Sequence, residues 1–151
     1  MRDFFATDTE IHPLDNRRSG RLYVAICAPG KGAQTPIVRI WSALMQSAQD
    51  IYRNNPNAAI DPFWTLVGYF NAMRELAGAL SLYRQDIPQR LDSIAGANQR
   101  NLDESKRLEL SSRANSQNLP ALLSKLDIEF PNAQDSVFAT SMFGTGVDIN
   151  R

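Results

Sequence analysis

Cysteine and histidine are almost missing from this sequence of 151 residues, which contains one of each. The single cysteine, Cys27, excludes an internal disulfide framework and suits a reducing compartment such as the cytosol. Because Cys27 lies in the apolar run from Leu22 to Ala28, we expect a buried, inert thiol rather than a nucleophile. His12 has no partner at metal-ligand spacing, so neither a metal site nor a histidine-dependent triad is predicted.

Net charge and long hydrophobic segments are also lacking. The 16 Lys and Arg residues balance the 16 Asp and Glu residues, which argues against binding nucleic acid by charge alone but allows a local basic groove. No segment approaches the roughly 20 apolar residues that span a bilayer, and the N-terminus lacks the apolar core of a signal peptide. The sequence therefore predicts a cytoplasmic protein without a membrane partner.

The elements that the sequence does contain alternate between strand and helix patterns. Apolar runs predict strands at residues 22–28, 63–70, 108–111 and 136–140. Amphipathic periodicity predicts helices from Thr35 (as N-cap) to about residue 54, from Asn71 (as N-cap) through Tyr83, from Asp86-Ile87-Pro88 onward, and over 119–126. Residues 1–20 read as a lead-in segment, and about 95–107 as a surface loop or insertion.

This alternation predicts one α/β domain over residues 21–151, a parallel sheet flanked by helices with right-handed crossovers. The run 63–70 is apolar on both faces, which is typical of a central strand. The first helix is expected to bury a face that includes Trp41, Leu44 and Ile51.

The turn at Pro29-Gly30-Lys31-Gly32 does not meet the requirements of a phosphate loop. Lys31 is followed by Gly32, and no Ser or Thr stands beside it. A strand-to-helix turn is the preferred interpretation, with Lys31 as a candidate single phosphate contact. The carboxylates Asp61, Glu75, Asp86 and Asp92 are scattered, so solvated faces and helix caps explain them better than acid–base chemistry.

The C-terminal segment, residues 135–149, is the most informative. A strand ends in Ala139-Thr140, and a small turn then leads to Gly146-Val147-Asp148-Ile149. Ligands bind at the carboxyl ends of parallel strands in this architecture, and glycines let a backbone approach phosphate closely. From spacing alone, a strand followed by a glycine turn and a capping Asp148 explains the pattern equally well.

The order of several motifs resembles the second RecA-like domain of superfamily 2 helicases. The segment from Ala139 to Ile149 resembles motif V, and Trp64 to Asn71 resembles the motif IV strand. The resemblance is greatest to DrmA-like helicases of the bacterial DISARM phage-defence systems. It extends from about Arg21 to Arg151 and includes Arg74-Glu75-Leu76-Ala77-Gly78-Ala79-Leu80, Asp86-Ile87-Pro88 and Leu110-Ser111-Ser112-Arg113.

This resemblance implies a partial RecA-like fold and specific roles for seven residues. Gly146 and Asp148 would contribute to ATP binding. The residues expected to contact nucleic acid, DNA rather than RNA, are Asn71, Ser112, Arg113, Thr140 and Ser141. The other implied partners are the first RecA-like domain of the same parent chain and further phage-defence subunits.

The sequence departs from the complete helicase pattern in three ways. It has neither a phosphate loop nor the acidic pair that holds magnesium, and it ends at Arg151 before the arginines of motif VI. An arginine finger alone is worth roughly 10³ to 10⁵ in rate. The chain by itself is therefore expected to bind neither ATP nor Mg²⁺ and to hydrolyse nothing, both cofactors belonging to the complete enzyme.

Two other functions stay open at this point. The chain could be a non-catalytic module that binds nucleic acid or protein, in which exposed apolar surface would favour self-association. It could also be an unrelated small α/β enzyme with a site at the turn between Gly30 and Thr35, although no acid, base or nucleophile converges there. In the helicase interpretation, an open sheet edge predicts marginal stability or aggregation.

Overall fold

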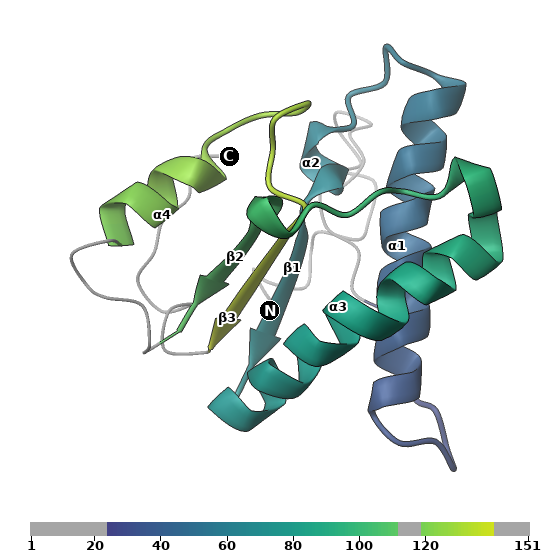
Figure 1. Ribbon diagram of the computed structural model, residues 1–151, viewed down its shortest axis with the longest axis vertical. Coiled ribbons are helices and arrows are strands. Elements are labelled where there is room, and N and C mark those ends of the chain that lie inside the picture. The colour runs from purple at the N-terminus through teal and green to yellow at the C-terminus, as the bar shows by residue number, and fades with distance from the viewer. Residues whose placement is uncertain (1–23, 112–118, 141–151) are drawn as a thin grey trace, which may run out of the picture. The chain divides into compact units, whose positions relative to one another are not determined.

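The computed structural model describes residues 24–111 and 119–140 (Figure 1). The chain divides into two compact units, Met1–Lys31 and Gly32–Arg151. Of the first unit, residues 24–31 are described. They end in a turn in which the Lys31 N–H donates to the Ala28 carbonyl oxygen at 3.2 Å. Gly30 has a φ of 73°, a left-handed conformation that favours glycine at this position.

The strand predicted at 22–28 is wrong over the residues that the structure describes. Residues 24–28 form no regular element, and Val24 and Ile26 are 67% and 57% exposed. Cys27 is exposed as well, so the prediction of a buried thiol is also wrong. An apolar run becomes a strand only where a neighbouring strand supplies hydrogen-bond partners, and none of the three described strands pairs with residues 24–28.

The second unit contains the sheet and the helices that cover it. Its helices are α1 (Gln34–Asn54), α2 (Asp61–Trp64), α3 (Met73–Ala95) and α4 (Leu119–Leu126), with 3₁₀ turns η2 (Gly96–Asn98) and η3 (Glu104–Lys106). Its strands are β1 (Leu66–Phe70), β2 (Arg107–Leu110) and β3 (Ser136–Thr140). They form a three-stranded parallel sheet in the order β1-β3-β2. This arrangement confirms the predicted α/β class and is consistent with a partial RecA-like fold.

Successive side chains of β3 point to opposite faces of the sheet and so belong to two different cores. Phe138 packs with α1 and α3, in a cluster that includes Met45 and Tyr83. Val137 and Ala139 pack on the other side with Leu126 of α4. Figure 1 shows α1 and α3 together on one face and α4 apart from them. The predicted ranges of α4 and β3 are confirmed, and β2 is confirmed as a strand that begins and ends one residue before the predicted range 108–111.

The predicted central strand at 63–70 is only partly right. Residues 61–64 form the short helix α2, which begins with Asp61 and a proline at its first turn, a good helix start. The Asp61 carboxylate accepts a hydrogen bond from the Phe130 N–H at 2.6 Å. The strand therefore begins at Leu66, and β3 rather than β1 is the central strand of the described sheet.

The predicted starts of the two long helices are also corrected. Helix α1 begins at Gln34 with Ala33 at the N-cap position, so Thr35 lies inside the first turn, and α3 has Ala72 rather than Asn71 as its N-cap. Helix α3 does not restart at Asp86, because it continues through Pro88. Proline normally breaks a helix. Tyr83 and Ile87 before Pro88 and Leu91 after it are buried, and their packing keeps α3 continuous.

The buried face of α1 differs from the predicted one. Leu44 and Ile51 are 55% and 49% exposed, whereas Ser42, Met45 and Gln46 are buried. The Gln46 side chain donates to Asp50 and to the Asn98 carbonyl oxygen, and it accepts from the Arg100 N–H at 2.9 Å. Burial of a polar residue is tolerated where its hydrogen bonds are made, which a hydrophobicity pattern does not register.

Candidate functional site

The three parallel strands end at one common edge of the sheet, which we call the carboxyl edge. Phe70 of β1 is level with Thr140 of β3, and Leu110 of β2 is level with Ala139. The residues that follow these strands therefore begin from neighbouring points. Ligands of α/β proteins bind at this edge, because helix N-termini and free backbone amides gather there.

Asn71 follows β1 directly and is exposed. Its backbone N–H donates to the Glu75 carboxylate at 3.2 Å, and Ala72 rather than Asn71 is the N-cap residue of α3. The side-chain amide offers both a donor and an acceptor at the carboxyl edge. The prediction of Asn71 as a helix cap is wrong, and its predicted contact with nucleic acid stays a prediction.

Thr140 is the last residue of the central strand. It is 6% exposed, and it lies on the same face as Phe138, two residues earlier in the strand. The structure therefore brings Thr140 to the carboxyl edge close to Asn71, with its side chain buried. Ser111, which follows β2, is fully buried, and its hydroxyl donates to the Glu109 carboxylate at 2.6 Å.

The other predicted site residues lie outside the described residues: Ser112, Arg113, Ser141, Gly146 and Asp148. Two of them follow described residues directly in the sequence. Ser112 comes directly after Ser111 at the end of β2, and Ser141 comes directly after Thr140 at the end of β3. Lys31, the candidate single phosphate contact, is exposed and belongs to the other compact unit.

The opposite edge, where the strands begin, is held by a buried polar network that no sequence pattern predicted. Arg100 donates from Nη2 to the Asp135 carboxylate at 2.7 Å and from Nη1 to the Trp64 carbonyl oxygen at 2.9 Å. The guanidinium carbon lies 3.8 Å from the centroid of the Trp64 ring, a cation–π arrangement. Asp135 also accepts from the Asp103 N–H at 3.1 Å.

The backbone completes this connection between the three strand starts. The Leu66 N–H donates to the Asp135 carbonyl oxygen at 3.0 Å, and the Asp135 N–H donates to the Lys106 carbonyl oxygen at 2.8 Å. The Thr65 hydroxyl donates to the Gln134 carbonyl oxygen at 2.7 Å. These bonds hold the three strands together at the edge where they begin.

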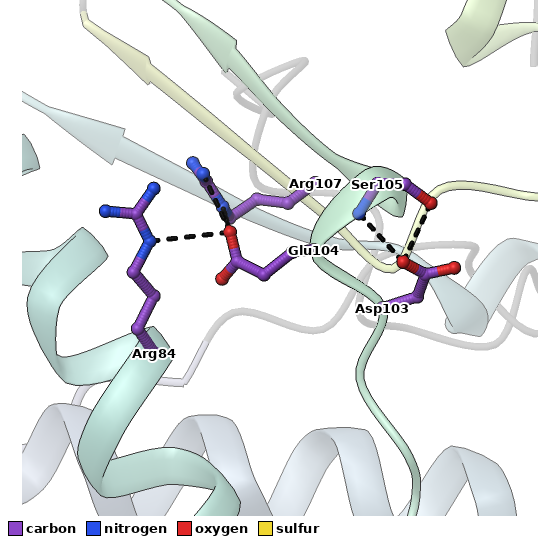
Figure 2. A network of polar contacts seen from close by, with 5 residues as sticks. All are labelled: Arg84, Asp103, Glu104, Ser105 and Arg107. Atoms are coloured by element: carbon purple, nitrogen blue, oxygen red, sulfur yellow. Dashed lines mark hydrogen bonds and ion pairs between the residues drawn. The ribbon is translucent and has the colours of Figure 1, made fainter.

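A second, exposed polar network lies in the segment between α3 and β2 (Figure 2). Glu104 pairs with Arg84 at 3.4 Å and with Arg107 at 3.0 Å. The Asp103 carboxylate accepts hydrogen bonds from the Ser105 hydroxyl at 2.7 Å and the Ser105 N–H at 2.8 Å. These bonds lower the pKa of Asp103 from its ordinary value. In the core nearby, burial raises the pKa of Tyr83 to about 12.

The described residues contain no group of three His, Cys, Asp or Glu side chains that could hold a metal ion. None of the helices in the described ranges combines the length and hydrophobicity that a membrane span requires.

Comparison with models of known protein families finds no match. Among curated proteins, DISARM protein DrmA of Bacillus paralicheniformis is 36% identical to the chain over 137 residues. This chain is related to DrmA. The match covers 87% of the chain but 12% of DrmA, so the chain spans a small part of that relative's length. The relationship to DrmA that the motif order predicted is thereby confirmed.

Proposed function

We propose that this chain is part of the second motor domain of a DrmA-like, ATP-dependent helicase that acts in phage defence. Within that domain its role is to hold the sugar–phosphate backbone of a nucleic-acid strand at the carboxyl edge of the sheet. DNA rather than RNA is the proposed strand. The first motor domain of the same polypeptide and other defence subunits are the proposed protein partners.

The observation that carries this proposal is the common end point of the three strands. Asn71 and Thr140 come from segments far apart in the sequence, yet Thr140 is level with Phe70, the residue before Asn71. Hydroxyls, amides and guanidinium groups such as that of Arg113 bind phosphate oxygens without reading base sequence. Several such contacts along one surface bind a nucleic-acid strand without sequence preference.

Each residue has a defined part in this binding. The Asn71 amide donates to a phosphate or sugar oxygen, and the Arg113 guanidinium neutralises phosphate charge and releases counterions. The Ser112 and Ser141 hydroxyls supply short-range hydrogen bonds. ATP and Mg²⁺ belong to the complete enzyme, with Gly146 and Asp148 assigned to the nucleotide. The described residues offer no metal-binding cluster, and no hydrolytic step is assigned to this chain.

Fluorescence anisotropy of labelled single-stranded DNA and RNA, titrated with the full chain, tests the proposal. Arg113→Ala is expected to weaken binding several-fold and to reduce the salt dependence by about one counterion. Asn71→Ala is expected to weaken binding to a smaller extent. The matched controls are Arg90→Ala and Asn57→Ala, both at exposed positions on other elements, and they should bind like the parent chain.

Two results would reject the proposal, and a third would reject only its preference for DNA. The first is no binding up to roughly 10⁻⁴ M at physiological salt, the weak end of non-specific affinity. The second is binding that the control substitutions reduce as much as the Arg113 and Asn71 substitutions do. The third is binding that is stronger to RNA, which would contradict the preference for DNA while leaving the carboxyl edge as the binding surface.

A further inference from the structure

The first turn of α3 lies at the carboxyl edge, directly after β1. The helix begins at Met73, and Ala72 is its N-cap residue. The first intrahelical bond runs from the Leu76 N–H to the Ala72 carbonyl oxygen, so the N–H groups of the first turn have no partner within the helix. An anion beside such a turn is stabilised by the amides and by the helix dipole.

A carboxylate of the protein itself already lies at this end of the helix. Glu75 Oε2 accepts a hydrogen bond from the Asn71 backbone N–H at 3.2 Å. A carboxylate oxygen carries negative charge and accepts hydrogen bonds in the same way as a phosphate oxygen. The Glu75 carboxylate therefore holds a backbone donor that a phosphate group would otherwise be able to use.

The contact between Glu75 and Asn71 is easily broken. Both residues are exposed, so water can replace either partner. At 3.2 Å the hydrogen bond is longer than the roughly 2.7–2.9 Å of strong charge-assisted bonds. Within residues 24–111 and 119–140, the Glu75 carboxylate forms no ion pair. Its release therefore breaks one solvent-accessible hydrogen bond and no ion pair among these residues.

The charge of Glu75 also acts on any anion that approaches the carboxyl edge. The first turn of α3 carries one charge of each sign, on the exposed residues Arg74 and Glu75. Like charges repel, and one N–H does not serve two anions at full strength. A phosphate group can therefore use the Asn71 N–H only after the Glu75 carboxylate has moved away.

We propose that Glu75 is a displaceable internal competitor at the carboxyl edge. A phosphate group of the bound strand takes its place on the Asn71 N–H, and Glu75 thereby lowers the affinity for the strand. When the strand leaves, the carboxylate returns to the amide at high effective concentration, because it is tethered to the same helix. This inference rests on the proposed binding of nucleic acid and adds a control of the same surface.

Fluorescence anisotropy of labelled single-stranded DNA, titrated with the full chain and its variants, tests this. Glu75→Gln keeps an acceptor oxygen but removes the charge, and Glu75→Ala removes both. The matched control is Asp86→Asn. Asp86 is exposed and lies about three helical turns after Glu75 on the same face of α3, so the control removes an equal charge away from the Asn71 N–H. Circular dichroism of each variant verifies that it is folded.

Both Glu75 variants are expected to bind the DNA about three- to fivefold more tightly than the parent chain, the effect of one exposed charge at a helix N-terminus. Asp86→Asn should change the affinity much less, because exposed charges more than about 10 Å apart are largely screened at 0.1 M salt.

The other outcomes separate this inference from the proposed function. An equal gain in Asp86→Asn would overturn the inference, since net charge would then be the cause. Weaker binding by Glu75→Ala with unchanged binding by Glu75→Gln would also overturn it, because Glu75 would then position Asn71 rather than compete. Unchanged binding by both Glu75 variants would overturn the inference alone. If neither the parent nor any variant binds DNA, the proposed function fails and the inference fails with it.

Discussion

The guanidinium of Arg100 and the carboxylate of Asp135 form a 2.7 Å ion pair whose two side chains are 1% and 5% exposed. The pair joins the irregular segment after α3 to the start of the central strand. Burying two charges is costly, and such a pair is tolerated only where further hydrogen bonds satisfy both partners. The Trp64 carbonyl oxygen and the Asp103 N–H each supply one such bond, while Arg100 Nε has no hydrogen-bond partner among the described residues.

Removing one partner of this pair should destabilise the protein strongly. Arg100→Met leaves Asp135 charged and buried, and we expect a loss of about 3–5 kcal/mol in the free energy of unfolding. Urea denaturation measures it. The control is Arg84→Met, because Arg84 belongs to an ion pair whose side chains are both 54% exposed, and such pairs contribute about 0–1 kcal/mol. Equal losses in the two variants would contradict the assigned role of Arg100.

A methyl group at Gly68 should also destabilise the fold. A Cβ there would stand 3.0 Å from Cδ1 of Phe138 and 3.2 Å from Cε2 of Phe70, so both rings must shift. We expect Gly68→Ala to cost about 1–3 kcal/mol, as overpacking does. Gly78→Ala is the matched control. Nothing lies within 4 Å of its added Cβ, and alanine should stabilise helix α3 by about 0.5–1 kcal/mol. Thermal melts that shift in the same direction for both would argue against this packing.

Alkaline pH should weaken the fold through Tyr83. Burial raises the pKa of Tyr83 from 10.0 to about 12, so the hydroxyl ionises more easily in the unfolded chain. Its contribution to stability is fully present below about pH 10 and is lost as the pH rises toward 12. Tyr83→Phe should therefore lose less stability over that range than the parent chain. Urea unfolding at several pH values tests this, with Tyr69→Phe as an exposed control that should follow the parent.

The carboxyl of Asp103 should respond to the loss of its neighbour. The Ser105 hydroxyl, followed by the Ser105 N–H, lowers the pKa of Asp103. Ser105→Ala removes the larger of the two causes, and the pKa of Asp103 should move up toward its ordinary value. Carbon-13 NMR titration of the carboxyl group measures it. The native bonds stabilise the charged form, so their contribution is present above the unfolded pKa and is lost as the pH falls. An unchanged titration would mean that the hydroxyl bond is not formed in solution.

Local patterns predicted the elements whose packing is simple. Residues 136–140 and 119–126 were predicted with their observed bounds, because each is a short apolar run between clear breaks. Residues 24–28 look equally strand-like but have no paired neighbour, and α3 continues through Pro88 because the buried residues around it outweigh the local penalty. Those two outcomes depend on tertiary contacts, which a single run of residues does not encode.

For the candidate site, sequence order placed Asn71 and Thr140 next to strand ends, and the sheet register brings those ends together. The burial of Thr140 could not be predicted, because its central position in the sheet is known only once the strand order is known. Arg100 was missed for a related reason. It lies in a polar stretch that resembles a surface loop, and its partners Gln46, Trp64 and Asp135 are 35 or more residues away.

The strand order also has a consequence for how the chain folds during synthesis. The central strand β3 is the last of the three in sequence, and in the described sheet β1 and β2 pair with β3 but not with each other. As the chain leaves the ribosome, β1 and β2 gain β3, their partner in the described sheet, only when residues 136–140 emerge. Pairings over such long separations form late and slowly. The nascent chain therefore carries the uncharged strand β1 without β3 while the residues between Phe70 and Ser136 are synthesised, a period in which chaperone binding would protect it from aggregation.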